Sequence, residues 1–150
     1  MAGVQAGAAG YGGGDRLTHG YFLGIAIGTY ESPGILLDES GRIRASAACP
    51  HDLSVPHPGY AEHDAEKVWW HDFCRLSHQL LEETGIKPEA IRAIGCSTIA
   101  PCCLPVDHDG KPLRPAILYG VDVRAADEIR QLNETLGAEA VLARTGNPIT

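Results

Sequence analysis

Between Tyr21 and Cys49 the sequence alternates short apolar runs with glycine-containing turns, which predicts an antiparallel meander of three strands. The runs are YFLGIAI, GILLDE and RIRASAAC, and the segments GTYESP and ESG separate them. Glycine suits such turns because it reaches positive φ without steric cost. The segment CPHDLSVPHPGYAEH follows, and its three prolines resist both a helix and an inner strand. We therefore expect this crossing to run extended over the surface.

From Asp64 the apolar period changes to that of a helix. The apolar residues of one predicted helix face are spaced by four, three and four: Trp69, Phe73, Leu76 and Leu80. Asp64 is suited to cap the start of this helix, Gly85 to follow its end, and Pro88 to stop it. The pattern predicts one long helix that packs on the meander.

The rest of the chain predicts further strands and a helix. AIRAIGCSTI indicates a buried strand, and CCLPVDHDGKPLRPAILY indicates a hairpin around Asp109 and Gly110. Residues 125–136 predict a helix whose inward side chains are Ile129, Leu132 and Leu136. Strands followed by a helix and another strand indicate an α/β sandwich.

Length and charge limit the classes of protein that fit. A chain of 150 residues suffices for one domain, or a piece of one, with a real core. The net charge of −7 argues against a nucleic-acid partner, because no basic stripe is present to neutralise phosphates. No apolar run approaches the ~20 residues of a membrane helix, so we expect no membrane partner.

The first twenty residues and the cysteines indicate the cellular compartment of the protein. Residues 1–20 are rich in glycine and alanine and lack a basic start and an apolar core, so they predict a disordered tail rather than a secretory signal. The five cysteines are Cys49, Cys74, Cys96, Cys102 and Cys103. Their odd number, apolar surroundings and lack of a C-x-x-C pair predict reduced thiols in a cytoplasmic protein.

A metal site is not expected. The histidines between residues 51 and 78 are His51, His57, His63, His71 and His78. On the predicted helix His71 and His78 lie about 10 Å apart along the axis, which is too far for one ion. Cys96, Cys102 and Cys103 match no metal-ligand spacing, and we expect them to be buried thiols.

Four segments, taken in order, resemble the N-terminal domain of the FGGY carbohydrate kinases, and xylulokinases most nearly. They are LGIAIGTYES, HPGYAEHDAEKVWW, IRAIGCST and GKPLRPAILYGVDVR, and the resemblance covers residues 21–150. It implies an incomplete ribonuclease H-like, actin-like ATPase fold of the α/β class, made of a meander, a crossover helix, a further strand, a hairpin and helices. In such kinases two domains close on ATP, Mg²⁺ and a sugar.

The resemblance assigns the first turn to the nucleotide. Gly28 and Thr29 would present backbone N–H groups and a hydroxyl to a phosphate of ATP. The family usually carries an aspartate two residues before the glycine, but here that position is Ala26, which has no oxygen for Mg²⁺. The alternative is that residues 25–27 are only core strand and that GTYES is an ordinary hairpin turn.

The substrate positions match the family only in part. Tyr119, Asp122 and Arg124 match its aromatic-x-Asp-x-Arg run with one extra residue, and the resemblance implies that they line a polyol site. The alternative is a surface ion pair at a helix start. Ala100 and Pro101 stand where related kinases place sugar-contacting residues, often a Met-His pair in xylulokinases.

These observations leave two functions open. The first is the N-terminal portion of an ATP-dependent carbohydrate kinase that acts on a sugar or polyol, with a pentulose such as xylulose favoured. In the family the general base and the adenine-binding half come from later segments, so we assign no catalytic residue here and expect a fragment of a longer kinase that does not turn over ATP on its own. The second is a non-catalytic, kinase-like module that binds a sugar or a partner. An open sheet edge in such a piece would favour self-association.

Overall fold

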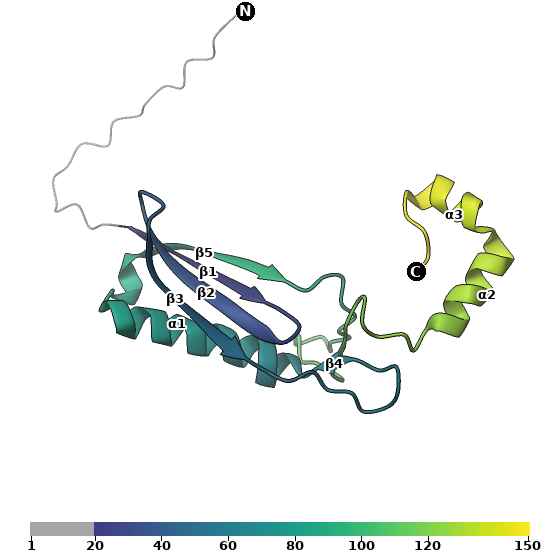
Figure 1. Ribbon diagram of the computed structural model, residues 1–150, viewed down its shortest axis with the longest axis horizontal. Coiled ribbons are helices and arrows are strands. Elements are labelled where there is room, and N and C mark those ends of the chain that lie inside the picture. Colours follow the sequence, from purple (N-terminus) through teal and green to yellow (C-terminus); the bar gives the residue numbers. More distant parts are fainter. Residues whose placement is uncertain (1–19) are drawn as a thin grey trace, which may run out of the picture.

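The computed structural model describes residues 20–150 (Figure 1). The predicted tail lies outside the described residues except for Gly20, which is buried and donates its N–H to Glu39 Oε1 at 2.9 Å. The strands are β1 (Tyr21–Ile27), β2 (Glu31–Asp38), β3 (Ile43–Pro50), β4 (Glu62–His63), β5 (Ile91–Thr98) and β6 (Ala116–Ile117). The helices are a π-helical turn (Ala65–Trp70), α1 (His71–Thr84), a 3-10 turn (Pro88–Ala90), α2 (Ala126–Leu136) and α3 (Ala138–Thr145).

The main sheet has the strand order β3-β2-β1-β5. β1, β2 and β3 pair antiparallel, which confirms the predicted meander, and β5 adds to β1 in parallel. The turn between β1 and β2 is shorter than the predicted segment 28–33, because residues 31–33 already pair with β3. The pairing of β1 with β2 ends at Gly34, so Pro33 lies where β2 pairs with β3 alone.

One face of this sheet packs on α1 (Figure 1). Alternate residues of the strands point toward the helix, and the buried cluster contains Leu23, Ile25, Ile27, Leu36, Cys49, Leu76 and Leu80. The helix has the predicted limits: the Asp64 carboxylate accepts the N–H groups of Glu66 and Lys67, and Gly85 ends the helix with a φ of 65°. The predicted apolar face is therefore confirmed.

The prediction of a buried strand at residues 90–99 is wrong. β5 lies at the edge of the sheet, and seven of its eight residues are exposed. The reason is that α1 packs mainly against β1, β2 and β3, and of β5 only Ile91 is packed against the buried cluster. For the same reason Cys96 is exposed. Cys103 is exposed as well and Cys102 is half-buried, so the expectation of buried thiols fails for all three.

The predicted helix at residues 125–136 is present as α2, but its apolar side chains are not inward. Leu132 is 45% exposed and Leu136 54% exposed, and Ile129 is half-buried. α2 and α3 extend away from the sheet (Figure 1), and within residues 20–150 the element that packs most against α2 is α3. The apolar spacing was right for a helix and gave no information on what covers it.

The proline-rich crossing is exposed over most of its length but not at its end. Ala61, Glu62 and His63 are buried, because β4 pairs with β6 and the N–H of Leu118 donates to the carbonyl of Ala61. This end of the crossing therefore holds the loop before α2 against the end of the main sheet.

None of the described helices is long and apolar enough to span a membrane.

Candidate functional site

The turn between β1 and β2 is closed by its own backbone. The N–H of Gly28 donates to the carbonyl of Glu31 at 3.0 Å. A Cβ atom on Gly28 would lie 2.5 Å from that carbonyl oxygen, so only glycine fits. The expected positive φ is present at Gly41 in the next turn but not at Gly28, where the close approach is what requires glycine.

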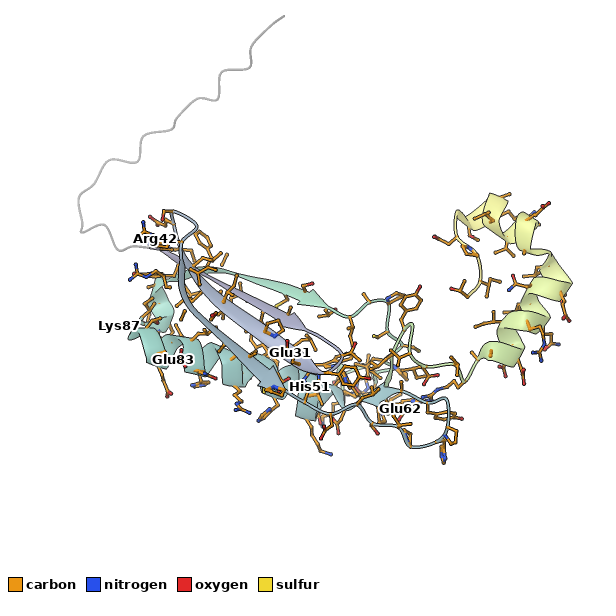
Figure 2. All side chains as sticks on the ribbon, in the orientation of Figure 1. Glu31, Arg42, His51, Glu62, Glu83 and Lys87 are labelled. Carbon is orange, nitrogen blue, oxygen red and sulfur yellow. The ribbon has the colours of Figure 1, made fainter. Side chains whose placement is uncertain are left out.

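Two histidines from the crossing contact this turn. His51 Nε2 lies 3.2 Å from the carbonyl oxygen of Gly28, and His63 Nε2 lies 3.1 Å from that of Thr29. The backbone N–H of His51 also donates to the carbonyl of Tyr30 at 2.9 Å. Figure 2 shows His51 and Glu31 at this same end of the sheet. Three successive carbonyl groups of the turn are thus bound by the crossing.

Asp72 on α1 anchors the first histidine. Its carboxylate, 2% exposed, accepts hydrogen bonds from Ser32 Oγ at 2.7 Å and Cys49 Sγ at 3.1 Å, and lies 2.7 Å from His51 Nδ1. Burial alone would raise the pKa of Asp72, but these hydrogen bonds outweigh it and the pKa is lowered. Burial, together with the Asp72 carboxylate, raises the pKa of the Cys49 thiol.

The ring of His51 lies between two acceptors. Its Nδ1 faces the Asp72 carboxylate and its Nε2 faces the carbonyl oxygen of Gly28, and the side chain is only 7% exposed. When both ring nitrogens carry a proton, each has an acceptor and His51 forms an ion pair with Asp72. Buried ion pairs of this kind need their remaining hydrogen bonds satisfied, and this pair satisfies them.

His63 is neutral, with one defined tautomer. The indole N–H of Trp69 donates to His63 Nδ1 at 3.1 Å, so the proton of the ring sits on Nε2 and points to Thr29. Burial lowers the pKa of His63, and the positive charge of His51 lowers it further. The two imidazole rings meet edge to face with 5.0 Å between their centroids.

Sequence reasoning missed these groups. It weighed the histidines only as metal ligands and did not consider Asp72. One signal was available: Asp72 precedes Leu76 and Leu80 at spacings of four, so it lies on the apolar face of the helix. A carboxylate on a buried face requires buried donors, and polar partners in the preceding strands could have been sought.

The predicted substrate residues lie in the loop before α2. Arg124 donates to both carboxylate oxygens of Asp122, through Nε at 2.8 Å and Nη2 at 2.6 Å. Asp122 also accepts the N–H of Ala61 at 2.7 Å, and the hydrogen bonds from Arg124 above all lower its pKa to about 2. The guanidinium lies 3.9 Å from the centre of the Tyr60 ring. The ion pair named as the alternative is therefore present, but it is largely shielded from solvent, with the Arg124 side chain 15% and the Asp122 side chain 2% exposed.

This ion pair belongs to a wider cluster around Glu62. The Glu62 carboxylate accepts hydrogen bonds from Arg124 at 2.7 Å and from Arg114. Glu62 is labelled in Figure 2 beside the loops that it joins. Since His63 follows directly and holds the first turn, two consecutive residues of β4 connect the turn with the substrate loop.

A hollow of about 570 Å³ lies on this loop. Its lining includes Pro101, Cys103, Tyr119, Asp122, Arg124 and Ile129. Tyr119 is 59% exposed, whereas the charged atoms of Asp122 and Arg124 are engaged with one another. The structure brings the three predicted substrate residues together, and their contact with a polyol stays a prediction.

Ala26 lies on the sheet face opposite α1. It pairs with Ser97 of β5, and with Gly24, Pro33 and Gly95 it lines a shallow hollow of about 380 Å³. Its methyl group supplies no oxygen to this surface.

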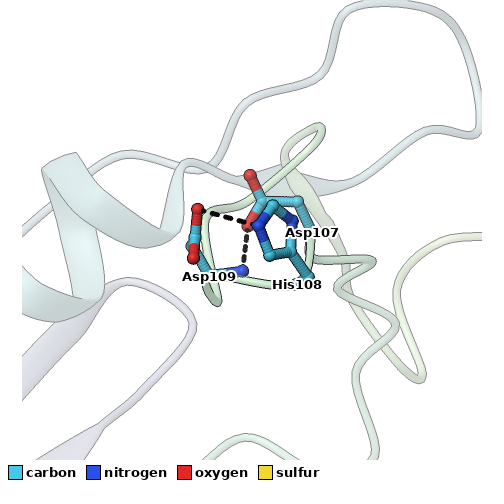
Figure 3. A group of neighbouring side chains, drawn as sticks. All are labelled: Asp107, His108 and Asp109. Atoms are coloured by element: carbon cyan, nitrogen blue, oxygen red, sulfur yellow. Dashed lines mark hydrogen bonds and ion pairs between the residues drawn. The ribbon is translucent and has the colours of Figure 1, made fainter.

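Asp107, His108 and Asp109 form a group at the tip of the predicted hairpin (Figure 3). The hairpin is confirmed by antiparallel bridges between Cys103 and Ile117 and between Val106 and Pro112. Asp107 Oδ1 accepts the N–H groups of Asp109 and Lys111, both at 2.9 Å, which is the usual way for an aspartate to close a turn. Turn formation accounts for this group, and we assign no metal to it.

A family model matches residues 21–150, and it describes the FGGY family of carbohydrate kinases, N-terminal domain. A curated glycerol kinase of Trichormus variabilis is 35% identical over 128 residues, which cover 85% of this chain and 25% of the relative. A glycerol kinase of Brevibacillus brevis is 35% identical over 127 residues, again with 25% of the relative covered. The chain thus spans about a quarter of the length of these relatives.

The fold has solved counterparts. The crystal structure of xylulose kinase from Rhodospirillum rubrum superposes with a TM-score of 0.76 at 34% identity. The match covers 87% of this chain and 26% of that structure. The mixed α/β arrangement of meander, helix and parallel strand is therefore that of a partial actin-like ATPase domain, as the sequence predicted.

Proposed function

This chain belongs to the FGGY family of carbohydrate kinases, and we propose that it is the N-terminal portion of an ATP-dependent kinase acting on a sugar or polyol. In this proposal the γ-phosphoryl group of ATP passes to a hydroxyl group of the substrate, which becomes a phosphate ester. The observation that carries the proposal is the turn at residues 28–30, where the N–H groups of Thr29 and Tyr30 have no hydrogen-bond partner among the residues that the structure describes. Phosphoryl transfer depends on such positioning groups more than on covalent chemistry by the protein.

The turn fits a phosphate group. Within residues 20–150 the N–H groups of Thr29 and Tyr30 and the hydroxyl of Thr29 donate no hydrogen bond. Thr29 is partly exposed and Tyr30 is exposed, so an anion can reach these donors. Adjacent backbone N–H groups in a turn form an anion-binding concavity. Gly28 contributes by permitting the tight turn, since its own N–H is bound to Glu31.

Residue 26 offers no ligand atom to Mg²⁺. Ala26 has no oxygen, and its neighbour across the strand pair is Ser97. A metal ion would have to be held by the nucleotide phosphates and by groups other than residue 26. We accordingly expect no turnover from the 150-residue chain alone.

For the substrate we propose a small polyhydroxylated molecule bound at the hollow beside Tyr119. An exposed aromatic ring beside a fixed pair of charges is suited to stack on a sugar and to orient its hydroxyl groups. A pentulose such as xylulose remains the favoured substrate, and glycerol is the natural competitor because two curated relatives carry the name glycerol kinase. A cytoplasmic location agrees with the free state of all five cysteines.

Two observations favour a second candidate, a sugar-binding module without catalysis. Ala26 replaces a carboxylate at the turn, and the exposed edge of β5 could pair with a second copy of the chain. Such a module would bind a sugar or polyol without consuming ATP.

The two candidates are separated by an assay of ADP release with Mg²⁺ and ATP, on the protein made from its native gene. The substrates would be glycerol, xylulose, ribulose and gluconate, each compared with a reaction that lacks sugar. Sugar-dependent ADP release with at least one substrate supports the kinase. Binding of a substrate by calorimetry, with no ADP release from any of them, refutes the kinase and supports the module.

A further inference from the structure

We infer that His51 and His63 are positioning residues that orient the peptide groups of the turn at residues 28–30 toward a phosphoryl group. The inference rests on the proposed kinase function and names the parts of the chain that prepare the turn. Neither histidine contacts the ligand in this arrangement. Each acts through the backbone of the turn.

The geometry of the peptide bond carries the argument. Within residues 20–150 the one cis peptide is Ala100–Pro101, so the peptides that join residues 28, 29 and 30 are trans. In a trans peptide the carbonyl group and the N–H group point in opposite directions. Because His51 holds the carbonyl of Gly28, the N–H of Thr29 points away from His51. Because His63 holds the carbonyl of Thr29, the N–H of Tyr30 points away from His63.

The result is a pair of successive donors, the first on a partly exposed residue and the second on an exposed one. The N–H groups of Thr29 and Tyr30 make no hydrogen bond within the described part of the chain. The Gly28 N–H is used to close the turn, and the carbonyl of Tyr30 is held by the backbone of His51. Every carbonyl of residues 28–30 therefore faces the protein, and the two unused N–H groups are left for an anion.

A second contact holds each histidine ring in place. The indole N–H of Trp69 holds His63 at 3.1 Å, and the carboxylate of Asp72 holds His51 at 2.7 Å. A flip of either peptide of the turn would leave a ring N–H without its acceptor in a buried place, which is unfavourable. The turn is thus preorganised before any ligand arrives, and preorganised donors bind an anion without a cost of reorganisation.

The test uses the 150-residue chain labelled with ¹⁵N, with pyrophosphate and Mg²⁺ as the probe and Mg²⁺ alone as the blank. The decisive variant is His63→Leu, because His63 is neutral and its loss leaves no charge unpaired. His63→Gln is the conservative variant, since its amide can donate to Thr29 and accept from Trp69. His78→Leu, on the exposed side of α1, is the matched control.

We expect pyrophosphate to move the amide resonances of Thr29 and Tyr30 in the unmodified chain and in the control. His63→Leu should weaken binding about tenfold or more, because a hydrogen bond to a charged group depends on the direction of its N–H. His63→Gln should restore affinity to within about threefold of the unmodified chain. A general loss of folding in His63→Leu would appear as loss of dispersion across all resonances. In that case the affinity of the His63→Gln variant for pyrophosphate tests the inference.

Three results would overturn the inference: no binding of pyrophosphate by the unmodified chain, binding that leaves the amides of Thr29 and Tyr30 unmoved, or equal affinity in a folded His63→Leu variant. None of them depends on turnover. Failure of the kinase proposal shows instead in the assay of ADP release.

Discussion

Removal of the Asp72 carboxylate should be among the most damaging single changes to the stability of this chain. Asp72→Ala deletes the acceptor of hydrogen bonds from Ser32 and Cys49 and leaves the His51 ring, 7% exposed, without the carboxylate that lies 2.7 Å from its Nδ1. Loss of one partner of a buried ion pair costs about 3 to 5 kcal/mol. For a chain of this size that corresponds to a fall of about 10 to 15 °C in Tm. Urea unfolding followed by tryptophan fluorescence measures it directly.

A control variant and the dependence on pH provide two comparisons for this test. Asp127→Ala removes an ion pair with Arg130 in which the aspartate side chain is 83% exposed, so we expect a loss below about 0.5 kcal/mol. Because the pKa of Asp72 is lowered in the folded chain, its contribution is complete above the unfolded pKa of about 3.9. The contribution is lost as the pH falls further through the folded pKa. A loss below about 1 kcal/mol at neutral pH for Asp72→Ala would refute the ion pair described above.

Three further predictions follow from the same end of the molecule. Gly28→Ala should cost about 1 to 3 kcal/mol in urea unfolding, because its Cβ would meet the carbonyl of Glu31 at 2.5 Å. Gly95→Ala, which meets nothing within 4 Å, should cost less than about 0.5 kcal/mol, and equal losses would contradict this reasoning. The lowered pKa of His63 means that the unfolded chain takes up a proton first as the pH falls below about 6.5, so the urea midpoint should be lower at pH 5.5 than at pH 7.5. An unchanged midpoint would count against a buried neutral ring. Tyr119→Ala should weaken sugar binding in calorimetry without lowering Tm, since this side chain is 59% exposed; unaltered affinity would remove Tyr119 from the proposed site.

The parts of the fold that depend on local signals could be predicted from the sequence. The meander follows from alternation and turns, and the limits of the long helix follow from a capping aspartate at Asp64 and a glycine at Gly85. The exposure of β5 and α2 could not be predicted in this way. Apolar spacing shows which side of a strand or helix prefers burial, but what covers that side depends on the rest of the assembly.

The candidate site shows the same division. The residues predicted a turn at Gly28 and Thr29, because a glycine after an apolar strand is a local signal, whereas its assignment to a nucleotide came from the family resemblance and stays a prediction. The groups behind it were not found, since Asp72 meets Ser32 across 40 positions of sequence and His51 across 21. Contacts of that separation are set by how β3, the crossing and α1 pack together, and single-sequence patterns do not encode them.

The parallel pairing of β5 with β1 has a consequence for how the chain acquires its structure. β1 and β2 pair residues as close as Ile25 and Gly34, whereas β5 brings Ile91 beside Tyr21. Contacts between neighbours in sequence form faster than contacts that must close a long loop. During synthesis, then, the hairpins of the meander can assemble as soon as they emerge, and α1 can dock on them next. We expect β5 to join the main sheet last among its four strands, so changes in β5 should alter the rate of unfolding far more than the rate of folding.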